Sequence, residues 1–257
     1  MPPISLFPTK PPASPDKSST SDWWISVNSP ARRIATADDY QVETIKTGRW
    51  KENSYVVQHV ASREIALIDP GNDADAIFES IEHMDGIPKL VLLTHAHFDH
   101  VGALDAVCTR YDLPFYIHSG DHRLLQRATL YAMSFERQVV TIPEGYQPLE
   151  TSTPSWSGDP VEFIHTPGHT DGGVCYYWDG ICFSGDTLLN KLVGRSDLPG
   201  SSGEGLKKSV SKLLDSLPPD TLLFPGHGGT WSVADARSWW QDYSEDPPQY
   251  AMEGAFK

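Results

Sequence analysis

Cysteine is rare in this sequence: only three of the 257 residues are cysteine, and none of them belongs to a C-x-x-C pair. This number and spacing argue against a disulfide framework and against a four-cysteine zinc site, and they favour a reducing compartment. Cys175 and Cys182 flank an expected hairpin turn at Asp179 and Gly180. A two-residue turn places Tyr177 opposite Cys182, so the two thiols are not expected to be cross-strand partners. We interpret the cysteines as packing residues.

Basic residues are also few, with 20 Lys and Arg against 34 Asp and Glu, and the formal net charge is −14. Without a basic stripe the chain cannot neutralise many phosphates, which argues against nucleic acid and anionic membranes as partners. The negative charge would favour binding of divalent cations, but it is explained equally well by solubility.

Long apolar runs are absent as well, because no stretch approaches the length of a bilayer-spanning helix. The first residues also lack the basic and apolar regions of a secretory signal. We therefore expect a soluble, cytoplasmic protein with no membrane partner. The length of 257 residues is sufficient for one sizeable core. The sequence leaves the oligomeric state open.

The chain divides into two parts of different composition. Residues 1–40 are rich in Pro, Ser, Thr and Lys, and six prolines among the first 15 residues disfavour regular structure. We predict that this part is an N-terminal extension that is flexible or wraps around the domain, with Trp23, Trp24 and Ile25 as a candidate anchor. Residues 41–257 are the predicted enzyme domain.

Within this domain, strand patterns occur at 41–46, 54–58, 64–69, 89–93, 114–118, 161–164, 174–183 and 221–224, and helical patterns at 73–84, 103–111, 123–133, 204–217 and 232–243. Strand-rich segments with helices in each half fit two sheets that pack face to face, with helices on the outer faces.

The most informative motif is Thr-His-Ala-His-Phe-Asp-His at residues 94–100. It follows the apolar run at 89–93, so His95, His97, Asp99 and His100 emerge together where a buried strand ends. Imidazole and carboxylate groups are the ligands that zinc and similar divalent metals prefer. A solvated histidine-rich turn is the alternative, but so many polar groups on one short loop favour a metal site.

Three later segments repeat one rule, in which an apolar strand and a glycine precede a single metal-type ligand. Residues 163–169 end in Pro-Gly-His169, residues 181–186 end in Gly-Asp186, and residues 222–227 end in Pro-Gly-His227. Seven candidate ligands therefore lie at the ends of four predicted strands.

This order of motifs resembles the metallo-β-lactamase fold superfamily, and the resemblance extends from about residue 40 to about residue 240. It implies an α+β fold, a four-layer αββα sandwich with metals at the edge of the sheets. Gly185-Asp-Thr-Leu, Gly194-Arg-Ser-Asp-Leu-Pro-Gly and Phe224-Pro-Gly-His-Gly further resemble the glyoxalase II-like (hydroxyacylglutathione hydrolase-like) enzymes. Only 30 residues follow His227 in this sequence, so we do not expect the glutathione-binding C-terminal helices of those enzymes, and the thiol of the substrate is left open.

The resemblance also implies how the ligands divide between two divalent metals. One metal is expected on His95, His97 and His169, a second on Asp99, His100 and His227, with Asp186 as a bridge between them. Zinc is the expected metal, with iron or manganese as alternatives. Asp99 and Asp186 are the expected catalytic carboxylates. A hydroxide between the two metals would attack an acyl carbon.

The expected reaction is hydrolysis of a small-molecule acyl thioester or a related acyl compound by this metal-dependent enzyme. One alternative on the same fold is a persulfide dioxygenase with a single iron on His95, His169 and Asp186. A lactonase, a β-lactamase or a non-catalytic member of the family are further alternatives, although the complete ligand set argues against the last.

Three residues outside the ligand set are also candidates. Asp69 matches the family's aspartate that braces the metal loop, or it is a plain strand-end cap. Arg195 is a candidate to bind a substrate carboxylate, and a structural pair with Asp197 is an equally supported alternative. His118 follows a predicted strand and is a weaker candidate for contact with the substrate.

Overall fold

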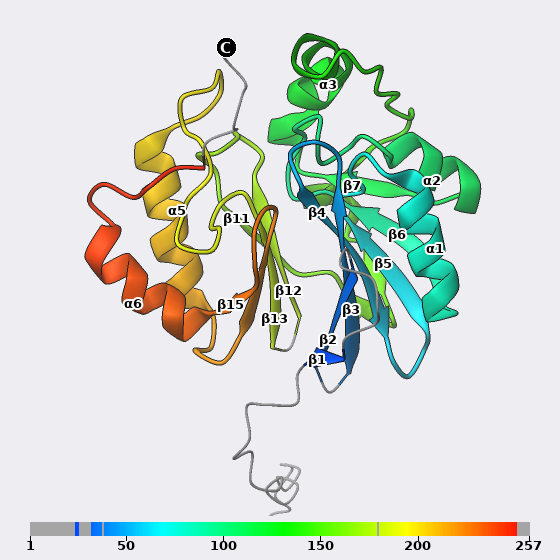
Figure 1. The fold of residues 1–257 in the computed structure, drawn as a ribbon, viewed down its shortest axis with the longest axis horizontal. Coiled ribbons are helices and arrows are strands. Elements are labelled where there is room, and N and C mark those ends of the chain that lie inside the picture. The colour runs from blue at the N-terminus through cyan, green and yellow to red at the C-terminus, as the bar shows by residue number, and fades with distance from the viewer. Residues whose placement is uncertain (1–23, 26–31, 38, 179, 251–257) are drawn as a thin grey trace, which may run out of the picture.

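The computed structural model describes residues 24–25, 32–37, 39–178 and 180–250, with side chains from residue 39 onward. Two β-sheets face each other in the middle of the molecule, and helices cover the outer face of each sheet (Figure 1). Within the described residues, no helix is both long enough and apolar enough to cross a bilayer.

The first sheet has eight strands that lie side by side in chain order. They are β1 (Trp24–Ile25), β2 (Arg32–Ala37), β3 (Tyr40–Thr47), β4 (Glu52–His59), β5 (Glu64–Ile68), β6 (Ile87–Leu92), β7 (Phe115–Ile117) and β8 (Gln147–Pro148). Strands β1 to β5 pair antiparallel, whereas β5 to β8 are parallel. Parallel neighbours end at the same edge of a sheet, so the loops after β5, β6 and β7 meet there.

The second sheet has five strands, also in chain order. They are β11 (Phe163–His165), β12 (Val174–Trp178), β13 (Ile181–Gly185), β14 (Leu222–Pro225) and β15 (Trp231–Ser232). Strands β13 and β14 are parallel, so the residues after them also meet at one edge. A short hairpin of β9 (Ser155–Trp156) and β10 (Asp159–Pro160) lies outside both sheets. The register pairs Tyr177 with Cys182, as the two-residue turn predicts.

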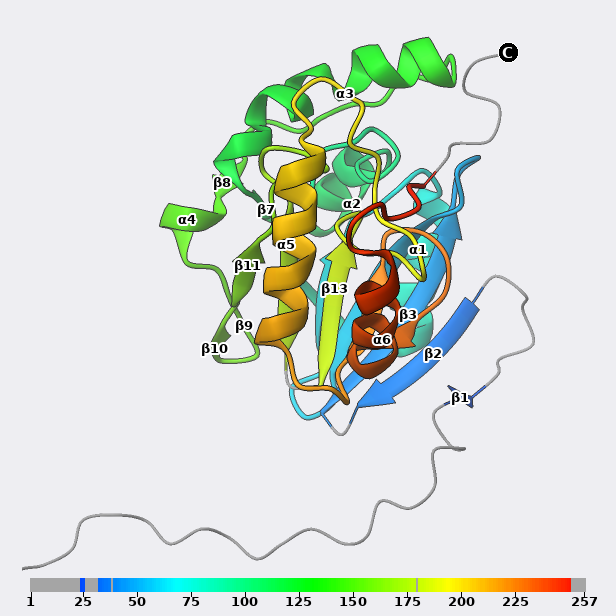
Figure 2. The same ribbon diagram turned by 90° about the vertical axis from the view of Figure 1, so that its left-hand side faces the viewer.

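Helices connect the strands. They are α1 (Ala74–Met84), α2 (Leu104–Tyr111), the 3-10 turn η1 (Ser119–Asp121), α3 (His122–Phe135), α4 (Leu149–Ser152), α5 (Gly203–Ser216) and α6 (Val233–Tyr243). Helices α1 and α2 cover the first sheet, and α5 and α6 lie in front of the second sheet in Figure 2.

Three apolar clusters fill the spaces between four layers. Strand β5 shows the alternation that produces them, because Ile65 and Leu67 face the cluster shared with α1 and α2, whereas Ala66 and Ile68 face the cluster between the sheets. The third cluster joins Cys182 of the second sheet to Val210 of α5 and to residues of α6. The α+β, four-layer αββα sandwich predicted from the sequence is therefore confirmed.

The first sheet begins earlier than the composition suggested. Backbone pairing places β2 along the whole of β3, with Arg32 opposite Ile45 and Ala37 opposite Tyr40. The segment assigned to an extension before residue 41 thus contributes strands to the sheet. Of the proposed aromatic anchor, Trp24 and Ile25 form β1, and Trp23 lies outside the described residues.

Candidate metal centre

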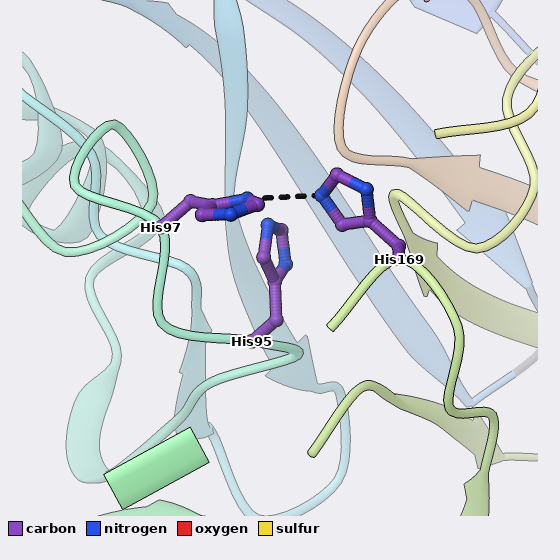
Figure 3. Close-up of side chains that lie close together, drawn as sticks. All are labelled: His95, His97 and His169. Carbon is purple, nitrogen blue, oxygen red and sulfur yellow. Dashed lines mark hydrogen bonds between the residues drawn. The ribbon is translucent and has the colours of Figure 1, made fainter. Parts of the chain in front are cut away.

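The first group of candidate ligands comes from two loops on opposite sheets. His95 and His97 lie in the loop after β6, and His169 lies in the loop after β11. Figure 3 shows the three rings pointing toward one another, with His97 Nδ1 at 2.9 Å from His169 Nε2. One ligand atom of each residue lies within 4.8 Å of the others. Three imidazoles at this separation can hold one divalent metal.

The second group lies beside the first. Ligand atoms of Asp99, His100 and His227 are also within 4.8 Å of one another, and His227 Nε2 is 3.5 Å from Asp99 Oδ2. Asp186 lies between the two groups, because its Oδ2 is 3.5 Å from His169 Nε2 and 3.6 Å from His227 Nε2. The structure thus brings together all seven residues that the motifs singled out.

Many of the atoms that face this space are buried and lack a hydrogen-bond partner within the part of the chain that the structure describes. They are Nε2 of His95, His100 and His227, both carboxylate oxygens of Asp99, and Oδ1 of Asp186. Each such atom costs about 1–3 kcal/mol when nothing compensates it. Nitrogen and carboxylate oxygen are the donors that a divalent metal takes, so the residues present fit a metal centre.

Four of the five imidazoles direct Nδ1 away from this space. In each case Nδ1 lies at hydrogen-bonding distance from an oxygen atom, which leaves Nε2 directed toward the space that the ligand atoms share. The pairs are His95 with Thr94 Oγ1 at 3.0 Å, His100 with Asp69 Oδ2 at 3.0 Å, His169 with the Arg195 carbonyl at 2.7 Å and His227 with the Trp50 carbonyl at 3.2 Å.

Asp69 holds the loop that carries the histidine motif. Its Oδ1 accepts a hydrogen bond from the Thr94 backbone N–H at 2.7 Å, and its Oδ2 accepts one from the Thr94 hydroxyl at 2.5 Å. The same Oδ2 accepts from His100, so one carboxylate fixes both ends of the motif. Asp69 follows β5 with a left-handed φ of 48°, a conformation that Asp tolerates better than most residues.

Burial and charge determine the protonation of these groups. Burial, together with the neighbouring His169, lowers the pKa of His97 to about 3, and burial and His100 lower the pKa of His95. For His100, burial is the largest single effect and opposes the charged form, but the hydrogen bond to Asp69 and the charges of Asp99 and Asp186 together outweigh it and raise the pKa. Burial also opposes the charged form of Asp186, yet the surrounding imidazoles lower its pKa. His95 and His97 thus offer neutral imidazoles beside the ionised Asp186 carboxylate, the forms that metal binding requires, whereas His100 favours its charged form and would release a proton when a metal binds.

Two glycines permit the close approach of the ligand segments. A Cβ atom on Gly226 would collide with the Asp186 carboxylate and with His100 Cε1. Gly185 has a left-handed φ of 47°, and a Cβ there would meet Thr94 Oγ1 at 2.5 Å. The glycine before a ligand therefore allows either a turn or close contact with the opposite sheet.

Two buried carboxylates of this region carry no metal motif and were missed in the sequence. Asp121 accepts hydrogen bonds from the Ala96 N–H at 3.0 Å and from the Gly172 N–H at 2.7 Å, and so connects the loops of the first ligand group. Glu52 lies behind His100, with Oε1 at 3.8 Å from His100 Nδ1. The sequence offered a signal for Asp121, because this residue follows the end of β7. It offered none for Glu52, which is the first residue of β4.

The side chains of the two candidate substrate residues pair with residues outside the ligand groups. The Arg195 guanidinium makes two hydrogen bonds of 2.9 Å to the Asp197 carboxylate, which is the structural pair left open above. His118 stacks on His165 with ring centroids 4.0 Å apart, and its Nε2 is 3.4 Å from Glu150 Oε1. Among the described residues, neither belongs to a group that could hold a metal.

Comparisons with known proteins identify the family of this chain's relatives. A family model described as the metallo-beta-lactamase superfamily matches residues 47–227, a range that includes all seven candidate ligands. The protein named probable metallo-hydrolase YqgX of Bacillus subtilis (strain 168) is 34% identical over 185 residues, which cover 70% of this chain and 87% of that relative.

Solved structures agree with the sequence relatives. The B3 metallo-beta-lactamase BLEG-1 is 31% identical, with a TM-score of 0.70, and the match covers 79% of this chain and 97% of that one. TTHA1623, solved in a di-iron-bound form, is 36% identical with a TM-score of 0.67, and the match covers 76% of this chain and 96% of that one.

Proposed function

The chain belongs to the metallo-beta-lactamase superfamily, and from that premise we propose that it is a dinuclear metal-dependent hydrolase that cleaves a small-molecule acyl thioester. Members of this superfamily include metal-dependent hydrolases, and its fold binds divalent metals, often two. Zinc is the metal we propose, and the residues that would hold the pair are the seven candidate ligands.

One observation carries the dinuclear assignment: buried ligand atoms that lack a hydrogen-bond partner among the described residues lie in both groups, on either side of Asp186. A single ion on His95, His169 and Asp186, as in a persulfide dioxygenase, would leave both oxygens of Asp99 and Nε2 of His227 uncompensated. Buried polar atoms are rarely left in that state. This favours two metals and therefore hydrolysis over the one-iron alternative.

The chain's own residues would prepare this centre for catalysis. When bound, two divalent metals supply a hydroxide nucleophile near neutral pH and polarise a carbonyl group. The hydrogen bonds that Nδ1 of these histidines makes with Asp69, Thr94 and the Trp50 carbonyl hold the imidazole rings in the orientation that ligation requires. The low pKa of His97 keeps its ring neutral, so the metal does not compete with a proton there.

The thioester assignment rests on the segments that resemble glyoxalase II-like enzymes. Two of these segments lie against the ligands, because the Gly194 N–H donates to the Asp186 carbonyl at 2.9 Å and the Gly226 N–H donates to the Gly185 carbonyl at 2.9 Å. Segments that resemble the glyoxalase II-like enzymes thus lie against the proposed ligands, which supports acyl thioesters as the substrate class over lactones and β-lactams.

The test compares substrates on protein loaded separately with zinc, iron and manganese. We expect S-D-lactoylglutathione or another acyl thioester to be hydrolysed to acid and thiol, with no oxygen consumed in an oxygen electrode. Glutathione persulfide, a lactone and a chromogenic cephalosporin are assayed in parallel, with Asp186→Ala as the inactive control. Oxygen uptake in proportion to persulfide would replace the proposal by the dioxygenase, and faster turnover of the lactone or the cephalosporin would replace it by those activities.

A further inference from the structure

The segment that follows α6 returns to the metal centre. We call residues 245–250 the C-terminal arm. It pairs with the loop after β13, because the Val193 N–H donates to the Pro248 carbonyl at 2.9 Å and the Tyr250 N–H donates to the Val193 carbonyl at 2.7 Å. The Gln249 side chain adds two hydrogen bonds to Ser196, of 3.1 and 3.0 Å. In Figure 2 the arm, in red, runs beside the yellow loop that follows β13.

This pairing places Tyr250 on the ring of His227. The two ring centroids are 4.4 Å apart and the ring planes are inclined by 21°, a stacked arrangement. The Tyr250 hydroxyl donates to the Trp50 carbonyl at 3.1 Å, and the same carbonyl lies 3.2 Å from His227 Nδ1. Tyr250 therefore contacts the face of the His227 ring. Its hydroxyl also bonds to the Trp50 carbonyl, the same oxygen that lies beside His227 Nδ1.

The same loop, which follows β13, also contacts the first ligand group. The Arg195 carbonyl accepts from His169 Nδ1 at 2.7 Å, and the Gly194 N–H donates to the Asp186 carbonyl at 2.9 Å. A Cβ on Gly194 would lie 2.7 Å from His169 Nδ1, so the loop has little room to move there. The arm and its loop thus contact ligand residues of both groups.

We propose that Tyr250 is a positioning residue for His227 and that the C-terminal arm is part of the metal centre. The inference rests on the proposed dinuclear function. An imidazole can rotate about its bond to Cβ, and ligation selects one orientation, so a free ring loses entropy when a metal binds. The stacked phenol ring and the shared carbonyl restrict this rotation before the metal arrives. Tyr250 thereby lowers the dissociation constant of the metal that His227 holds.

Three full-length variants test the inference. Tyr250→Ala removes both contacts, Tyr250→Phe keeps the stacked ring, and Tyr243→Ala is the matched control, because that tyrosine also stacks on an aromatic ring, Trp239 at 5.5 Å, but on the exposed side of α6. Dissociation constants of both zinc ions are measured by competition with a chromophoric chelator. We expect Tyr250→Ala to weaken one zinc about 10–100-fold, Tyr250→Phe to weaken it only a few-fold, and Tyr243→Ala to match the wild type.

Equal zinc constants in the wild type and Tyr250→Ala would overturn the inference, and so would equal losses in Tyr250→Ala and Tyr243→Ala. Failure of the proposed function looks different, because the wild type itself would then bind a single metal or hydrolyse no acyl compound. In that case long-range ¹H–¹⁵N spectra of the metal-free protein decide. We expect one His227 tautomer in the wild type and Tyr250→Phe and a mixture in Tyr250→Ala, whereas identical spectra for all three would refute the positioning role.

Discussion

The Asp69 carboxylate lies 3.0 Å from Nδ1 of His100, and both groups are almost completely buried. The Asp69 oxygen that faces His100, Oδ2, also accepts a hydrogen bond from the Thr94 hydroxyl. The oxygen of that hydroxyl lies 3.0 Å from Nδ1 of His95. Two imidazoles that face different ligand groups therefore depend on one carboxylate oxygen. Asp69 couples the two groups although we assign it no contact with a metal.

This coupling predicts the effect of Asp69→Asn. Asn tolerates the left-handed backbone that Asp69 adopts, but its amide nitrogen cannot accept a hydrogen bond from His100. We expect metal affinity to fall about 10–100-fold, measured by elemental analysis after dialysis against a chelator. Asp112→Asn is the control, since Asp112 has a similar φ of 52° but is exposed at the end of α2. Full metal retention by Asp69→Asn would show that the carboxylate only caps β5.

Removal of Asp186 should have a larger effect. Its carboxylate lies within 3.7 Å of His100, His169 and His227, so it is the side chain that both groups share. Without this negative charge two bound cations would repel each other more strongly. We expect Asp186→Ala to lose detectable turnover and to retain fewer metals than the wild type, as measured by elemental analysis and thioester kinetics. An active Asp186→Ala enzyme would contradict the proposed mechanism.

The ligands could be predicted from the sequence because each follows the end of a buried strand. Apolar runs that end in Gly-Asp186 or Pro-Gly-His227 report local structure, and parallel strands bring such ends to one edge. The helix predicted from residue 232 likewise begins at Val233, because the Ser232 side chain accepts the Asp235 N–H at its start. Local sequence patterns of this kind predict most of the helices and strands.

The residues that brace the ligands could not be predicted in this way. Tyr250 and Trp50 meet across 200 residues of sequence, and Asp121 and Gly172 across 51. A single hydrogen bond between distant segments leaves no periodic pattern in either of them. Strand β2 was missed for a related reason, since its pairing with β3 is visible only once the sheet exists. Contacts between residues that are far apart in the sequence therefore could not be predicted from it.

The stacked pair of His118 and His165 predicts a pH dependence of stability. Burial and the neighbouring His165 lower the pKa of His118, and the weaker opposing effect comes from Glu150. Below its unfolded pKa of about 6.5 the unfolded chain binds a proton at His118 that the folded chain does not, so stability falls as pH decreases. We expect His118→Asn, whose side chain can still accept the Gly120 N–H, to lose less stability between pH of about 7.5 and about 5.5.

The measurement is the melting temperature of both proteins at the two pH values with metal in excess. Stacking lost in the variant lowers both of its melting temperatures, so only the difference between the two pH values is compared with that of the wild type. An equal difference in the two proteins would show that His118 does not contribute to the acid sensitivity.

The last prediction concerns the pair of Arg195 and Asp197. The guanidinium is 12% exposed and the carboxylate 64% exposed, so the pair is partly screened by solvent. Pairs of this kind contribute about 0.2–1 kcal/mol, which corresponds to a melting temperature lower by up to about 2–4 °C. We therefore expect Arg195→Ala and Asp197→Ala to lower the melting temperature by similar amounts, and the double variant to lose little more than either single one.

The same variants test whether Arg195 binds substrate. If its guanidinium held a substrate carboxylate, Arg195→Ala would raise KM about 10–150-fold for a carboxylate-bearing thioester and leave KM unchanged for one without a carboxylate. Because Asp197 already accepts from Nε and Nη2 and so holds one edge of the guanidinium, we expect the two KM values to change equally little. A rise confined to the carboxylate-bearing thioester, with an unchanged melting temperature, would instead assign Arg195 to the substrate. In that case Asp197→Ala should lower the same KM, since it would release the guanidinium from its competing partner.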